Sequence, residues 1–262
     1  MNLTKVFSVI VLFTVLVSCG KSDKQQAAER LQLAQKVYAQ GDTTQALQQL
    51  DTLKMRYKDV IKTEIEAKKF TQKIYSEILY NKQAEMDSLK LKIAKLEKNF
   101  IKEKTQFDLD TQMIYKRQQF KNRWNKSFIQ VHLDEKGNLY ISSNYFGDKW
   151  LNHTGIRVYD DTLQAKTKKV PLNNVLNHHS DFMNTKWEKV TYRNGDENGV
   201  IQFIADHAKR NLKAVFLGSR YYYIILESYD KRAMVEALEL SKALKQKIKL
   251  QKEIDSLQAK VV

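Results

Sequence analysis

The spacing of hydrophobic residues along the chain separates helical segments from strand-forming ones. Over residues 27–59, two apolar stripes with helical periodicity are separated by Gly41 and Asp42, a pair that interrupts helices. A turn this short between two helices predicts an antiparallel helical hairpin. Residues 60–121 contain neither proline nor glycine and are rich in lysine, glutamate, glutamine, isoleucine and leucine, which predicts a single long helix.

Two helical segments carry the heptad spacing of a coiled coil, with charged residues between the apolar positions. One is the long helix, and the other is residues 230–262, where Asp230 is expected to cap the helix. We expect the last helix to pack antiparallel on residues 79–110; the alternative is pairing with a second copy of the chain. The apolar positions are Leu79, Met86, Leu89, Ile93, Leu96, Phe100 and Phe107 in the first segment and Leu250, Ile254, Leu257 and Val261 in the second.

Residues 122–229 have a different composition, with all three tryptophans and the only proline. Alternating apolar runs predict strands on both sides of short turns at 134–138, 160–162 and 218–219. A further strand is expected at 186–192 and a short helix at 199–208. The chain is therefore predicted to have an α+β fold. An N-terminal helical hairpin and a long coiled-coil helix precede a β-rich head domain, which is inserted before a C-terminal helix that packs back on the stalk.

The beginning of the chain has the three parts of an export signal. Lys5 precedes an apolar stretch at residues 6–17, and the small residue Ser18 precedes Cys19. The stretch is too short to span a bilayer, so residues 1–18 are predicted to be a signal peptide. Cys19 is the only cysteine, which excludes a disulfide within the chain. The small and polar residues 19–26 are expected to form a tether.

The segment Leu16-Val17-Ser18-Cys19 resembles the lipobox of bacterial lipoproteins, in which the cysteine receives a diacylglyceryl group and becomes the first residue of the mature chain. The resemblance implies lipid attachment at Cys19, including palmitate, and therefore a place in the cell envelope. Gly20 stands where an aspartate would retain the protein in the inner membrane, so the outer membrane is favoured. The alternative is an ordinary signal peptide that happens to contain a cysteine.

Residues 27–59 resemble one tetratricopeptide repeat, with Ala34 and Ala46 at the small positions and Gly41 at the turn. The sequence departs from the repeat where Lys58 replaces a proline and Arg30 replaces a tryptophan. A single hairpin of this type cannot bury its own apolar face. The resemblance therefore implies a docking or capping element, and a plain helical hairpin is the alternative.

The charge of the chain does not indicate a nucleic-acid partner. The formal net charge is +15, but the cations are spread along the whole chain, whereas a nucleic-acid-binding protein concentrates them on one face or module. No nucleic-acid partner is therefore expected. The predicted partners are membrane lipid, through Cys19, and another envelope protein or a second copy, through the coiled coil.

The sequence contains no recognisable catalytic constellation. His178, His179 and Asp181 form the only histidine cluster, which we interpret as a solvated loop, and His207 as a structural histidine. The glycines are too widely spaced for a phosphate-binding loop. We therefore predict a protein that is not an enzyme and that carries no cofactor and no metal.

The candidate ligand-binding residues are aromatic: Trp150, Trp187, Tyr221 and Tyr223. In a strand, Tyr221 and Tyr223 share one face and, with the two tryptophans, would form a platform for glycan or peptide; core packing of these residues is the favoured alternative. The predicted function is a membrane-anchored envelope lipoprotein acting as a non-enzymatic structural or protein-interaction module. A glycan- or cell-wall-binding lipoprotein is the alternative, and an exported enzyme without a recognisable motif is the third possibility.

Overall fold

The computed structural model describes residues 21–104, 111–182 and 184–261. The chain divides into two compact units, one formed by residues up to Ile78 together with the C-terminal end from Ala259, the other by Leu79–Gln258. The predicted signal peptide, Cys19 and Phe107 lie outside the described residues. Within the described helices, none is both long enough and apolar enough to cross a membrane.

The first unit contains the predicted helical hairpin, formed by α1 (Asp23–Ala39) and α2 (Thr43–Arg56), which packs on the beginning of α3 (Ile61–Glu97). Helix α1 begins four residues earlier than predicted, because Ser22 and Gln25 form a capping box. The predicted tether to residue 26 is therefore too long. The shared core consists of Leu31, Ala34, Val37, Ala46, Leu50, Leu53, Ala67 and Ile74.

The long helix is shorter than predicted, since α3 ends at Glu97 and not near residue 121. The chain then forms β1 (Phe100–Glu103) and β2 (Gln112–Tyr115), followed by the 3-10 turns η1 (Lys116–Gln118) and η2 (Phe120–Asn122). The absence of proline and glycine permits a helix but does not impose one. The consecutive apolar residues 113–115 are buried by pairing in a sheet, so the β-rich domain begins at residue 100, not at 122.

The described residues of the β-rich domain form two antiparallel sheets. Six strands have the order β1-β2-β3-β4-β8-β7, and four have the order β10-β9-β5-β6. The predicted hairpins are confirmed as the pairs β3–β4, β5–β6 and β9–β10, and the short helix is α4 (Val200–Asp206). The remaining strands are β3 (Phe128–Asp134), β4 (Leu139–Gly147), β5 (Gly155–Asp160), β6 (Leu163–Lys166), β7 (Asn177–Phe182), β8 (Thr185–Tyr192), β9 (Lys213–Leu217) and β10 (Tyr221–Ile225).

The prediction of a loop at His178 and His179 is wrong, because both residues lie in β7 and pair with β8. Strand β7 is one of the two outer strands of the six-stranded sheet. An edge strand needs only one neighbour for its backbone and tolerates polar side chains on both faces. The apolar alternation that identifies the inner strands is therefore missing from it.

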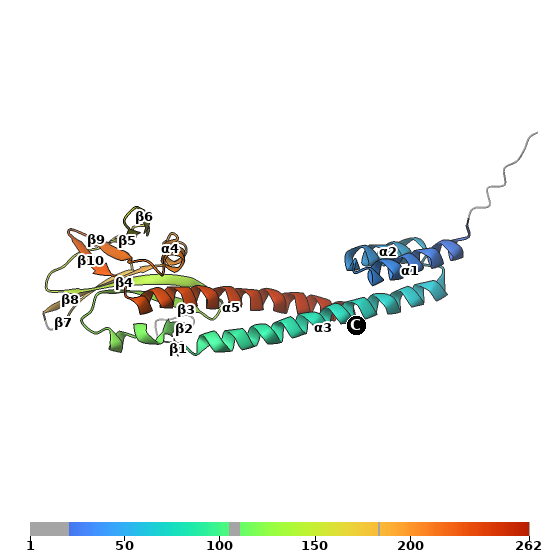
Figure 1. Ribbon diagram of the computed structural model, residues 1–262, viewed down its shortest axis with the longest axis horizontal. Coiled ribbons are helices and arrows are strands. Elements are labelled where there is room, and N and C mark those ends of the chain that lie inside the picture. The colour runs from blue at the N-terminus through green and yellow to red at the C-terminus, as the bar shows by residue number, and fades with distance from the viewer. Residues whose placement is uncertain (1–20, 105–110, 183, 262) are drawn as a thin grey trace, which may run out of the picture. The chain divides into compact units, whose positions relative to one another are not determined.

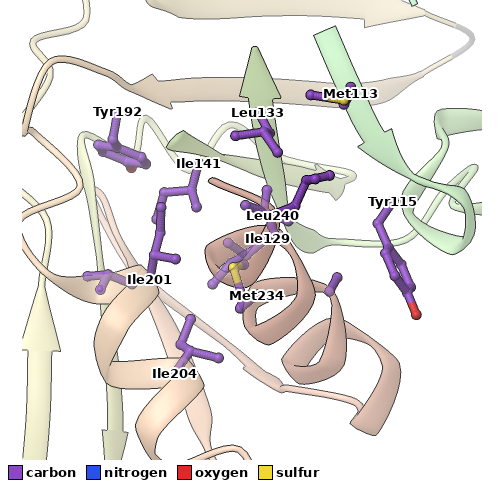
Figure 2. Close-up of a cluster of buried hydrophobic side chains, with 14 of the residues drawn as sticks. Met113, Tyr115, Ile129, Leu133, Ile141, Tyr192, Ile201, Ile204, Met234 and Leu240 are labelled. Atoms are coloured by element: carbon purple, nitrogen blue, oxygen red, sulfur yellow. The ribbon is translucent and has the colours of Figure 1, made fainter. Parts of the chain in front are cut away.

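The core of the domain lies between the sheets and the last helix, α5 (Ser228–Val261). Ile129, Leu133 and Ile141 from the six-stranded sheet point toward Met234 and Leu240 of α5, with side chains of α4 beside them (Figure 2). Strand residues alternate between the two faces of a sheet. Only one face of the six-stranded sheet is therefore used for this core.

Helix α5 also packs antiparallel on the second half of α3, as predicted (Figure 1). Nζ of Lys82 lies 2.9 Å from a carboxylate oxygen of Glu253, and Asn99, just beyond α3, donates a hydrogen bond to Glu236 at 2.7 Å. Asp230 is not the cap of α5, which begins two residues earlier. Its carboxylate is buried and accepts hydrogen bonds from Gln118 at 2.9 Å and Arg123 at 3.1 Å.

Candidate functional site

The face of the six-stranded sheet that turns away from the core carries a pocket of about 700 Å³. In β3, Ile129, Val131 and Leu133 belong to the core, so Gln130 and His132 face the opposite way and line the pocket. The register of the strands places the neighbouring lining residues on this same face. The lining residues are Glu103, Gln112, Ile114, Phe120, Trp124, Asn125, Gln130, His132, Tyr140, Asn144, Phe146, Ser180, Thr185, Trp187 and Lys189.

Four aromatic rings form a wall at one end of the pocket. The ring of Phe120 lies 5.4 Å from that of Trp187 and 5.5 Å from that of Trp124, and Phe146 stacks on Trp187 at 6.1 Å. Trp124 is 54% exposed and Phe120 is 39% exposed, although aromatic rings are usually covered in a folded domain. The wall therefore presents flat apolar surface to solvent beside a hollow.

The floor of the pocket is polar and held in place by hydrogen bonds. Nε2 of His132 lies 2.9 Å from the Ser142 hydroxyl, and its ring stacks on Tyr140 at 4.5 Å. Gln130 donates to the backbone carbonyl of Gln118 at 2.8 Å. Because each group has a partner that fixes its orientation, the floor is organised before any ligand arrives.

The pocket has little net charge. Burial, and then the nearby cations Lys189 and Arg193, hold the pKa of His132 well below its usual value, so this imidazole is neutral at physiological pH. The charged lining residues are then Glu103 and Lys189, which have opposite signs. A smaller, polar hollow of about 400 Å³ shares Gln112 and Tyr140 with the pocket and continues it along the sheet.

A second arrangement, on the core side of the sheet, combines a hydroxyl, an imidazole and a carboxylate. The Ser143 hydroxyl lies 2.8 Å from Nε2 of His153, and Nδ1 of His153 lies 2.6 Å from Glu188. This is the order of groups that activates a nucleophile in hydrolases. All three residues are fully buried, with 0% exposure, and the Ser143 hydroxyl also contacts the Tyr192 hydroxyl at 3.1 Å. A substrate has no access to this serine.

The buried carboxylate instead fixes the loop that precedes β5. The backbone N–H groups of Leu151, Asn152 and His153 donate to Glu188 at 2.6, 2.8 and 3.0 Å. Burial raises the pKa of Glu188, but the hydrogen bonds from the His153 side chain and from the loop backbone outweigh it and lower the pKa to about 2. The chain of polar groups is thus a structural element of the core.

The structure separates the four aromatic residues that the sequence analysis selected. Trp187 lines the pocket. Trp150 stacks on His179 at 5.2 Å. His179 pairs with Glu188 across β7 and β8, so both side chains lie on the face of the sheet away from the pocket. Tyr221 and Tyr223 are on β10, at 62% and 55% exposure, so core packing, the favoured alternative, is wrong for both.

Sequence reasoning missed the exposed wall residues Phe120 and Trp124. Both lie next to the boundary at residue 121 that was drawn between helix and head, and Phe120 was assigned to a helix. A spacing of four residues between two aromatics in a polar segment was the available signal.

The histidines of β7 have ordinary partners, since His179 bonds Asn177 at 3.0 Å and the His178 ring contacts that of Trp187. Within the described ranges, no group of three or more histidine, cysteine or acidic residues could hold a metal.

Comparisons with known protein families, with characterised proteins and with solved structures find no match to this chain.

Proposed function

We propose that this chain is a membrane-anchored lipoprotein of the cell envelope whose β-rich domain binds a ligand in the pocket on the six-stranded sheet. The anchor is supported by the lipobox resemblance at Cys19, with the outer membrane as the favoured location. The observation that supports ligand binding most directly is the pocket itself, which combines an exposed aromatic wall with an organised polar floor. Pockets of this size and composition are typical of small-ligand sites.

Binding without catalysis is the activity that this geometry favours. A hydrolytic site needs a nucleophile or an activated water together with a base that a substrate can reach. The nucleophile-like chain of Ser143, His153 and Glu188 is fully buried. Its imidazole and carboxylate are used to hold other groups of the core, and the pocket lies on the opposite face of the sheet.

A protein-interaction role is the second candidate, and β10 supports it. This strand is one of the two outer strands of the four-stranded sheet, and Tyr221, Tyr223 and Ile225 are 62%, 55% and 70% exposed. An exposed edge strand with an apolar face can pair with a strand of another protein.

A thermal-shift screen of the chain from Gly20 onward tests the proposal. The panel contains peptides, fatty acids, nucleotides, and neutral and charged saccharides, each monitored for product by mass spectrometry. At least one class is expected to raise the melting temperature of the parent but not of a Trp124→Ala variant, and to be recovered unchanged. If no class stabilises the parent, or if the stabilising ligand is converted to product, the proposal is wrong.

A further inference from the structure

The aromatic wall offers flat rings at the surface of the pocket and not an enclosed apolar tunnel. Trp124 and Phe120 are both partly exposed, while Phe146 and Trp187 are stacked behind them. A lipid chain gains most from being surrounded by apolar groups on all sides. A ring whose C–H groups lie on one flat face and whose polar groups lie at its edge fits a one-sided wall better.

The floor complements a ligand that carries many hydroxyl groups. It presents the amides of Gln112, Gln130 and Asn144 and the hydroxyls of Tyr140 and Ser180. An amide offers both a donor and an acceptor, as a hydroxyl does. Side chains of this kind suit alcohols, because an alcohol also donates and accepts hydrogen bonds. They suit a ligand that can only donate, or only accept, less well.

The charge of the pocket differs from that of the whole chain. The chain carries a formal charge of +15, yet the pocket lining contains only one cation, Lys189, and one anion, Glu103, and its histidine is neutral. A site for phosphate or sulfate esters would concentrate arginine or lysine. The lining therefore favours an uncharged ligand.

The position of the pocket also disfavours an extended peptide. The pocket lies on the face of the sheet, and the backbone groups of β3, β4 and β8 are bonded to one another in the ladder. Extended peptides are usually recognised by backbone pairing at a free strand edge, which this face does not offer. Side chains alone supply the contacts here.

From these features we infer that the pocket binds a neutral oligosaccharide, with sugar rings stacked on Trp124 and Phe120 and hydroxyls bonded to the amides of the floor. The inference depends on the proposed function and specifies its ligand class. The smaller polar hollow that shares Gln112 and Tyr140 with the pocket gives the saccharide chain a path beyond it. The pocket lining contains one carboxylate, Glu103, and the hollow adds Asp134. Glycoside hydrolysis normally uses two carboxyl groups as acid and base or nucleophile, but the Asp134 carboxylate accepts hydrogen bonds from the backbone of Lys136 and Asn138 and from the Asn138 side chain, so we infer that the saccharide is bound and not cut.

Isothermal titration of the chain from Gly20 onward tests the inference with defined tetrasaccharides. The neutral probes are β-1,4-linked N-acetylglucosamine, β-1,4-linked glucose and α-1,4-linked glucose. The charged probes are the deacetylated glucosamine tetramer and a sulfated tetrasaccharide, and an uncharged tetrapeptide is included. At least one neutral saccharide is expected to bind, and to bind at least about tenfold more tightly than each charged probe and the peptide, a difference of about 1.4 kcal/mol.

Variants locate the site and control for folding. Trp124→Ala is expected to weaken binding at least about tenfold, and Trp124→Phe, which keeps a flat ring, to retain most of it. Tyr221→Ala removes a similarly exposed aromatic residue outside the pocket and should bind like the parent. Circular dichroism and the melting temperature check each fold.

The possible outcomes separate the inference from the proposed function. Binding of a charged probe or of the peptide, lost in Trp124→Ala, with no binding of neutral saccharides, overturns the saccharide inference but leaves the pocket as a binding site. Saccharide binding that is lost in Tyr221→Ala and unchanged in Trp124→Ala overturns the inference by placing the site elsewhere. The absence of binding by any probe also overturns the inference, and the wider thermal-shift screen then decides the proposed function.

Discussion

Replacing Glu188 with glutamine is expected to destabilise the β-rich unit by at least about 3 kcal/mol at neutral pH. The carboxylate is fully buried and accepts hydrogen bonds from three successive backbone N–H groups and from His153. A glutamine side chain retains one acceptor oxygen and turns an N–H group toward these donors. The substitution therefore leaves donors unpaired in the core.

The magnitude follows from the ionisation of the carboxylate. The pKa of Glu188 falls from its usual value of 4.5 to about 2, and a tenfold change in an ionisation constant is worth about 1.4 kcal/mol. Because the folded-state pKa is the lower one, the contribution of about 3 kcal/mol is fully present above pH 4.5 and is lost as the pH falls toward 2. The difference in stability between the parent and Glu188→Gln should therefore narrow by about 2 kcal/mol between pH 7 and pH 3.

Urea unfolding followed by tryptophan fluorescence measures this difference, since Trp124, Trp150 and Trp187 all lie in the unit of Leu79–Gln258. The same substitution at the exposed Glu239 is the matched control and should change stability by less than about 0.5 kcal/mol. A Glu188→Gln effect below about 1 kcal/mol, or an effect of the same size at both pH values, would refute this account of the buried carboxylate.

Three further predictions concern the proposed anchor, the helix pair and one turn. Cys19→Ala should abolish labelling with palmitate, and equal labelling of variant and parent would contradict lipid attachment. Carbodiimide should crosslink Lys82 to Glu253 within one chain, because Nζ of Lys82 lies 2.9 Å from a carboxylate oxygen of Glu253. If isotope-labelled and unlabelled chains are mixed, crosslinked peptides that contain one labelled and one unlabelled half would instead indicate pairing between copies. Gly137→Ala should lower stability by at least about 1 kcal/mol in thermal unfolding, because φ is +84° and a Cβ would lie 2.8 Å from the Ser241 carbonyl oxygen; unchanged stability would contradict this.

The elements that the sequence predicted correctly are those whose signals are local. The hairpins β3–β4, β5–β6 and β9–β10 were identified from alternating runs around short turns, and the helical hairpin from its periodicity around Gly41. The pairing of α3 with α5 was inferred from two apolar seams without other partners. Each of these signals, whether alternation, turn residues or apolar spacing, can be read from the residues of the segment itself.

The elements that were missed depend on contacts between distant segments. Residues 112–115 become a strand because β3 pairs with them, and their own composition also suits a helix. The pocket brings Phe120 and Trp124 together with Phe146 and Trp187, from strands β4 and β8. His153 and Glu188 are 35 residues apart. No local pattern identifies such partners before the strand order is known.

The position of α5 in the core has a consequence for the order in which the domain can fold. The apolar side chains that cover the six-stranded sheet include Met234, Ala237 and Leu240, and they belong to a helix that follows all the described strands in the chain. A nascent chain that ends at Ile225 possesses every described strand but lacks the helix that completes their core. The sheet therefore acquires its full stability only after α5 has been synthesised, and a truncated chain without this helix would expose apolar strands that are prone to aggregate.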